Sequence, residues 1–317
     1  MNKRERVIAA INGEPVDKVP ASFSLHFNKD KAFGEEGIKS HLEFFQRTNT
    51  DILKIMNENL LPYMGEIRKP QDWRNIKTIS LKDDFMQAQI DFVKRILDKC
   101  DNTAFTVGTI HGITASAIHP IEAIYGYEAT RELLCQHIRE DKAPVMDAIK
   151  RITDGLCQLA QKYIELGLDG VYYASLGGEK RYFTNEEFEE CIAPFDKMVL
   201  SAVKEKNAYN CLHICKNDLN MQRYASYKDF ADIVNWGIYE TNYSLEEGRN
   251  LFDGVTIMGG LANRSGVLVD ATDDELVQAV KSLISSFGKT KFILGADCTL
   301  PTEISYERIL TAVNAVK

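Results

Sequence analysis

The feature of this sequence that most constrains its fold is a regular alternation between short apolar runs and longer amphipathic segments. The apolar runs are rich in β-branched and aromatic residues, which favour strands, and the amphipathic segments have helical periodicity. Eight runs are predicted as strands: 19–27, 51–57, 103–110, 168–174, 208–213, 233–239, 254–260 and 291–297. Helices are predicted at 39–47, 85–99, 147–166, 185–204, 244–251, 273–287 and 305–316.

Eight strands separated by helices indicate parallel βα units. No low-complexity linker or sequence repeat divides the 317 residues, so the chain is predicted to be one domain over 1–317. That number of units favours a single (β/α)8 barrel over an open doubly wound sheet. In such a barrel the active site lies at the carboxyl ends of the strands.

Residue types that carry chemistry gather at those predicted strand ends. Four of the six histidines fall at or near them: His26, His111, His119 and His213. Candidate catalytic residues are His26, Glu58, His111 and Glu179. Candidate cofactor contacts are Asn57, Ser175, Tyr239 and Gly260.

The strongest candidate site is a metal centre made by His213, Cys215 and Cys298. Residues two apart in a strand point to the same side, so His213 and Cys215 can share one ion. We expect the fifth and eighth strands to face each other across the mouth, which would let Cys298 complete the set. An imidazole with two thiolates suits zinc and leaves a coordination position open. The alternative is a hydrogen-bonded histidine with two core thiols; Cys211, one pleat deeper, is predicted to be core.

Two thiolate ligands make zinc a poorer Lewis acid, which favours activation of a bound thiol over activation of water. Glu58 and Glu179 are candidates for a fourth zinc ligand or for a base, with solvated loop acids as the alternative. His26 and His111 are candidates for substrate contacts, with structural roles as the alternative. The 259–266 loop matches no phosphate-binding motif and is predicted to be a tight turn, with a ligand-facing loop as the alternative.

Composition limits the partners of such a site. A net charge of −8 and a pI near 5.4 argue against nucleic acid, which needs a basic face. No segment has the length of a membrane span or the pattern of a signal peptide. Seven cysteines without a framework spacing indicate reduced thiols, and the chain is expected to be cytoplasmic. Four of them fall in helical patterns and are predicted to be inert core thiols: Cys100, Cys135, Cys157 and Cys191.

The opening segment 3–20, KRERVIAAINGEPVDKVP, resembles the start of the uroporphyrinogen decarboxylase superfamily, and the similarity extends along the chain. The resemblance implies a single (β/α)8 barrel. The true decarboxylases carry an arginine-rich Arg-Gln-Ala-Gly-Arg segment after the first strand, which holds the many carboxylates of their substrate. Here 23–28 reads Phe-Ser-Leu-His-Phe-Asn, and no arginine occurs between Arg6 and Arg47.

A second branch of that superfamily, the methylcobamide:thiol methyltransferases that include those acting on coenzyme M, holds zinc by His-X-Cys and a distant Cys. His213, Cys215 and Cys298 match that pattern. The resemblance therefore implies zinc binding and methyl transfer from a methylated corrinoid to a thiol or similar small acceptor. Glu179, in Gly177-Gly178-Glu179, departs from the familiar versions of the branch.

No Asp-X-His-X-X-Gly corrinoid motif occurs in the sequence, so a separate corrinoid protein is expected to present the methyl group. A homo-oligomer is compatible with the sequence. The alternatives are a tetrapyrrole decarboxylase that needs no metal and a barrel that binds a corrinoid without catalysis.

Overall fold

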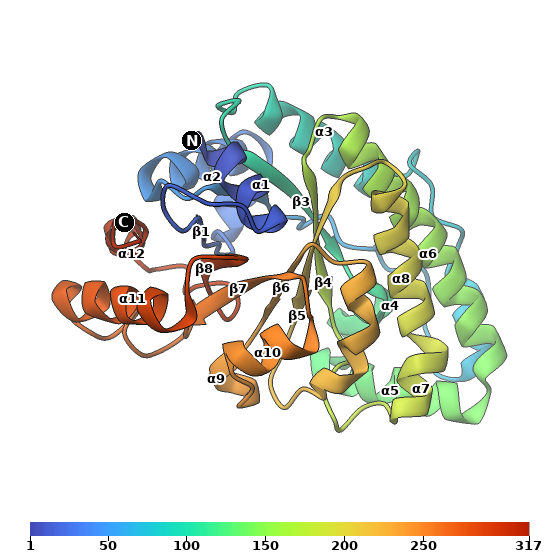
Figure 1. The fold of residues 1–317 in the computed structure, drawn as a ribbon. Coiled ribbons are helices and arrows are strands. Elements are labelled where there is room, and N and C mark those ends of the chain that lie inside the picture. The colour runs from blue at the N-terminus through green and yellow to red at the C-terminus, as the bar shows by residue number, and fades with distance from the viewer. Residues whose placement is uncertain (317) are drawn as a thin grey trace.

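Eight parallel strands form one sheet whose order is β1-β8-β7-β6-β5-β4-β3-β2, and helices surround it (Figure 1). The computed structural model describes residues 1–316. The strands are β1 Ala21–Ser22, β2 Ile52–Ile55, β3 Phe105–His111, β4 Gly170–Ser175, β5 Tyr209–Ile214, β6 Ile233–Trp236, β7 Thr256–Leu261 and β8 Phe292–Ala296. The predicted (β/α)8 barrel is confirmed.

The helices are α1 Lys3–Asn12, α2 Gly34–Thr48, α3 Asp84–Leu97, α4 Ile113–Tyr125, α5 Tyr127–Glu140, α6 Lys142–Glu165, α7 Asn185–Cys191, α8 Ala193–Lys204, α9 Ile238–Thr241, α10 Leu245–Leu251, α11 Asp273–Phe287 and α12 Tyr306–Asn314. Short 3-10 segments lie at Lys29–Lys31, Pro70–Asn75 and Met221–Asp229. Capping boxes begin α7, α10 and α11, as the Ser/Thr-X-X-Glu patterns in the sequence indicate.

The barrel closes between β1 and β2 through the side chain of Asp51. The Asp51 amide donates to the Ala21 carbonyl at 2.8 Å, and the Ala21 amide donates to Asp51 Oδ2 at 2.9 Å. Arg6 Nη1 donates to the other carboxylate oxygen at 2.5 Å. The Asp51 side chain therefore replaces part of the backbone hydrogen bonding between β1 and β2. The predicted strand 19–27 is wrong in length, because beyond Ser22 only Leu25 forms a β-bridge, to Leu300.

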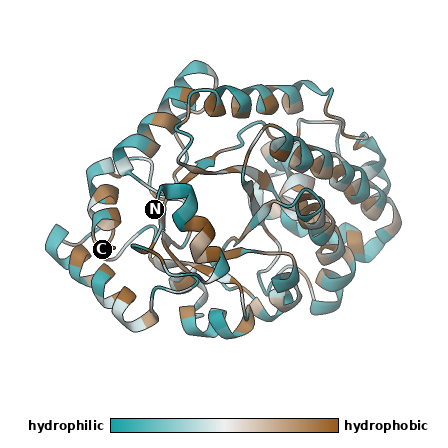
Figure 2. Cartoon of the chain, turned by 45° about the horizontal axis from the view of Figure 1, so that its top comes forward, coloured by the Kyte–Doolittle hydropathy of each residue, from teal (hydrophilic) through white to brown (hydrophobic). Residues whose placement is uncertain are grey.

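The interior of the barrel is filled by side chains rather than open. Apolar residues from β2 to β8 form one inner cluster with Val7 and Ile11 of α1, which covers the amino-terminal end of the strands. The surrounding helices turn apolar faces to the sheet and hydrophilic faces outward (Figure 2). The opposite, carboxyl-terminal end is left for the loops that carry the predicted site.

Two further predicted elements differ from the structure, and some helices were not predicted. The predicted helix 185–204 is broken at Ile192, because Pro194 cannot continue the preceding turn and instead lies in the first turn of α8. The predicted strand 233–239 ends at Trp236, and α9 follows it. Helices α1, α4 and α5 were not predicted; α4 is apolar on most sides and contains Pro120, so it has little helical periodicity.

Within residues 1–316 no helix is long and apolar enough to cross a membrane. The seven cysteines are free thiols.

Candidate metal centre

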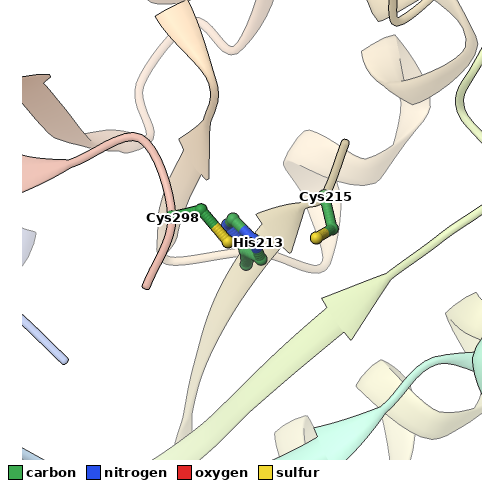
Figure 3. Close-up of side chains that lie close together, drawn as sticks. All are labelled: His213, Cys215 and Cys298. Carbon is green, nitrogen blue, oxygen red and sulfur yellow. Dashed lines mark hydrogen bonds between the residues drawn. The ribbon is translucent and has the colours of Figure 1, made fainter. Parts of the chain in front are cut away.

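The three predicted metal ligands converge at the carboxyl-terminal end of the barrel. His213 lies near the end of β5, Cys215 follows that strand, and Cys298 follows β8. Their ligand atoms all lie within 4.8 Å of one another, and Cys298 Sγ is 3.4 Å from His213 Nε2. Both sulfurs point toward the imidazole (Figure 3). The structure thus brings together residues 85 positions apart in the chain.

Asn235 on β6 fixes the orientation and tautomer of His213. Its Nδ2 donates to the carbonyls of Met258 and Ala296 at 2.9 and 3.0 Å. Because carbonyls only accept, the amide oxygen must face His213, whose Nδ1 lies 2.6 Å away and donates. The Nε2 lone pair is therefore left free on the side of the two thiols, as a metal ligand requires.

The same asparagine explains how the two halves of the site meet. The expectation that the fifth and eighth strands face each other across the mouth is wrong, because only β6 and β7 separate them in the ring. Asn235 bridges that interval, since it contacts His213 on one side and the backbone of β7 and β8 on the other.

One thiol of the site, that of Cys298, differs from the other cysteines in its electrostatics. The pKa of Cys298 is held well below its usual range, first by the neighbouring Cys215 thiol, which can donate a proton to its thiolate, and then by His213. Burial raises the pKa of Cys100 and Cys157 to about 11 and that of Cys135 and Cys211 to about 12. Cys298 is thus the first thiol of the site to ionise, whereas the hydrogen bond with Cys298 and burial raise the pKa of Cys215 well above its usual range. The buried thiols elsewhere are inert.

The donor set fits zinc. Two thiols and an imidazole with its accepting nitrogen exposed form a nitrogen and sulfur set of the kind that zinc prefers. The hydrogen bond from His213 Nδ1 to Asn235 is already in place, and such a bond is usual for an imidazole that binds a metal. Within residues 1–316 this is the one cluster of three such side chains at metal-binding distance.

We expect Asn235→Leu to weaken zinc binding by about 10- to 100-fold, the usual effect of losing an outer hydrogen-bond partner. Competition with a chromogenic chelator measures the affinity. Asn235→Asp keeps an acceptor for His213 Nδ1 and is expected to retain more of the affinity than the leucine variant. Equal affinity in wild type and Asn235→Leu would contradict the orienting role.

A pocket of about 320 Å³ opens beside the three ligands. It extends from His213 and both cysteines across the mouth to β2, β3 and α4. A more open pocket of about 410 Å³ adjoins Cys215 and Cys298 on another side, next to Asn263 and Arg264. The two cysteines are therefore reached from two directions.

Three of the four predicted catalytic residues line the first pocket. His26 and Glu58 stand at its rim, where His26 Nδ1 lies 2.7 Å from Glu58 Oε1. His111 lies deeper and packs edge-on against His119, with ring centroids 5.0 Å apart. Burial lowers the pKa of His111 well below its usual value and that of His119 to about 4, so both imidazoles are neutral at pH 7.

Glu179 is placed differently. It is buried and forms an ion pair with Arg131 of α5, and it does not line the pocket. The amide of Gly177 donates to its other oxygen at 3.2 Å. Its ligand atoms are not part of the metal cluster, and its carboxylate already has partners. This position supports a structural role rather than the predicted role as base or fourth ligand.

The four predicted cofactor contacts also lie outside the main pocket. Ser175 is fully buried and bonded to Asp196 and Tyr224. Asn57 lines a small neighbouring cavity. Gly260 lies within β7, where a side chain would collide with Leu283 of α11. Tyr239 is 64% exposed, because β6 ends before it and α9 turns its side chain outward.

Several residues that contact the site or line its pocket had no predicted role, among them Asn235, Tyr172 and Lys54. His119, which the sequence placed near a strand end without a role, also lines the pocket. The sequence indicates that Lys54 is unusual, because this charged residue interrupts the apolar run Ile52-Leu53-Lys54-Ile55. Asn235 likewise stands within the apolar strand Ile233–Trp236. A polar residue within an apolar, strand-like run is a cue for function that the sequence itself carries.

The fold and the site define a (β/α)8 barrel with a candidate His/Cys/Cys metal centre at the carboxyl ends of its strands. The chain belongs to the uroporphyrinogen decarboxylase (URO-D) family, whose sequence model matches residues 53–317. The predicted superfamily is thereby confirmed. A comparison with curated proteins gave no significant match.

Solved structures share the fold over nearly the whole chain. A methyltransferase from Methanosarcina mazei has a TM-score of 0.78 at 17% identity, covering 99% of this chain and 98% of that one. A B12-independent methionine synthase from Shewanella sp. W3-18-1, in complex with selenomethionine, has a TM-score of 0.62 at 12% identity, with 94% and 96% coverage. A putative vitamin-B12-independent methionine synthase from Listeria monocytogenes has a TM-score of 0.56 at 11% identity, with 95% and 98% coverage.

Proposed function

We propose that this protein is a zinc-dependent methyltransferase that moves a methyl group from a methylated corrinoid to a thiol or similar small acceptor. The observation that carries the proposal is the convergence of His213, Cys215 and Cys298 at the edge of a pocket, with the histidine tautomer set for ligation. The fold shared with a protein described as a methyltransferase agrees with it.

Zinc held by these residues would lower the pKa of an acceptor thiol and keep its sulfur nucleophilic. His213, Cys215 and Cys298 would position that sulfur at the end of the pocket. A methylated corrinoid would supply the methyl group there: the acceptor sulfur would bond to the methyl carbon with its own electron pair, and the electrons of the broken carbon–cobalt bond would stay with the corrinoid. A separate corrinoid protein would present the donor on the open side of the site, next to Arg264.

The second candidate is a tetrapyrrole decarboxylase, which the family membership favours. A substrate with many carboxylates needs a cluster of cations. Among the described residues that line the main pocket there is no arginine, and its lysines are Lys54 and Lys216. Methyl transfer therefore agrees better with the residues present.

The deciding experiment incubates zinc-loaded protein with methylcobalamin and a panel of small thiols, and follows demethylation by absorbance. We expect methyl transfer that stops after chelation and returns when zinc is restored. Carbon dioxide release from uroporphyrinogen that survives chelation would establish the decarboxylase instead. Corrinoid binding without demethylation by any thiol would indicate a non-catalytic barrel.

A further inference from the structure

Lys54 is a half-buried cation that the proposed function has not yet used. It lies on β2 and points into the barrel, where its Nζ is 3.6 Å from the centre of the Tyr172 ring. Its one side-chain hydrogen bond is a long contact of 3.4 Å to Ser24 Oγ. In the described part of the chain no carboxylate forms an ion pair with it.

An ammonium that loses part of its hydration inside a barrel without an ion-pair partner is costly to keep charged. Burial lowers the pKa of Lys54 to about 8, and the largest opposing influences are the sulfurs of Cys298, Cys211 and Cys215. The ammonium form still predominates at pH 7. Once the cysteine thiolates are committed to a zinc ion, this cation would be free to meet an anion that a ligand brings.

The surroundings of Lys54 connect it to the metal ligands. Lys54 and Cys298 line the same pocket, and they also line a smaller cavity below it. Tyr172, over which the ammonium lies, stacks on His213 with ring centroids 5.5 Å apart. The ammonium and the candidate metal centre therefore face the same space.

Glu58 and Glu122 both line that pocket, but in the described part of the chain neither forms an ion pair with Lys54. The thiolates of Cys215 and Cys298 would balance the two charges of a zinc ion, and the imidazole of His213 adds none. His111 and His119 are neutral, and Glu58 is already bonded to His26. The other lysine, Lys216, lies over the ring of Tyr127 at 4.5 Å.

We propose that Lys54 is a specificity-determining residue that makes the pocket bind a deprotonated, anionic sulfur in preference to a neutral ligand. This inference rests on the proposed function and deepens it. Lys54 offsets the negative charge that the acceptor sulfur brings when it loses its proton, so it lowers the free energy of the thiolate form of the acceptor. It is a positioning and charge-balancing residue and does not itself bond to the methyl group.

The test uses full-length protein loaded with cobalt(II) in place of zinc, because cobalt shows a near-ultraviolet thiolate absorption band. The protein is titrated with 2-mercaptoethanol, which carries no charge apart from its thiol, and separately with neutral imidazole. The variants are Lys54→Met and Lys54→Arg. The matched control is Lys197→Met, which removes another lysine that lies over a tyrosine ring, far from the site on α8.

We expect Lys54→Met to weaken 2-mercaptoethanol binding about 10- to 100-fold, the effect of one nearby charge at an effective dielectric constant of about 20. Imidazole binding is expected to stay within about twofold of wild type, because the charge of a neutral ligand does not respond to Lys54. Lys54→Arg is expected to restore most of the thiol affinity, and Lys197→Met to leave it unchanged.

Equal thiol affinity in wild type and Lys54→Met would overturn the inference while leaving the metal centre intact. Parallel losses for thiol and imidazole would also overturn it, since they indicate a packing role. Failure of wild-type protein to bind cobalt or zinc would overturn the proposed function and this inference together. Cobalt uptake by each variant shows that it is folded, so these outcomes are distinguishable.

Discussion

Cys298→Ser protein is expected to lose its zinc and with it methyl transfer to a thiol. Wild type should contain about one zinc ion per chain, whereas the serine variant should contain almost none after dialysis. A hydroxyl group is a poor substitute for a thiolate, because it stays protonated at neutral pH and is a harder ligand. The loss of activity should exceed the roughly 10- to 100-fold that removal of an outer partner costs.

Metal analysis and the methylcobalamin assay measure both effects on the same preparations. Cys215→Ser is expected to behave like Cys298→Ser, and the double variant should be no worse than either, because one site is destroyed in each case. Cys157→Ser is the matched control, since that half-buried thiol lies on α6 away from the site. Stoichiometric zinc in Cys298→Ser would refute the metal centre.

Arg131→Met is expected to destabilise the protein by about 3–5 kcal/mol, because it leaves the carboxylate of Glu179 buried without its partner. Both side chains are only 3% exposed. The guanidinium of Arg131 also lies over the rings of Tyr127 and Tyr182, so the methionine loses those contacts as well. Urea unfolding at constant zinc concentration measures the free energy of unfolding.

The control for this prediction is Arg139→Met on the same helix. Arg139 is half exposed and pairs with Glu187, so its loss should cost about 0–1 kcal/mol. Zinc content provides a second readout: Glu179→Gln should keep full zinc, because the carboxylate belongs to the ion pair with Arg131. If zinc is lost from folded Glu179→Gln, Glu179 is a metal ligand, as its place after the fourth strand allows, and the structural role is wrong.

Most of the fold could be predicted from the sequence, because buried apolar residues recur with a different spacing in strands than in helices. The runs that became β3, β4, β5, β7 and β8 were recognised within a few residues. The errors have local physical causes. Pro194 divides α7 from α8, β1 is shortened where Asp51 takes over the closure, and the uniformly apolar α4 lacks a polar face to mark it.

The identities of His213, Cys215 and Cys298 were also set by the sequence, because ligand chemistry is a property of residue type and the strand period places His213 and Cys215 together. The tertiary structure alone decided what the charged and polar groups of the site contact: Asn235 for His213, Arg131 for Glu179, and, among the described residues, no ion-pair partner for Lys54. These outcomes depend on contacts between strands and helices far apart in the chain. No local sequence pattern encodes such contacts. They decide that Glu179 has a structural role and that Lys54 remains able to bind a ligand.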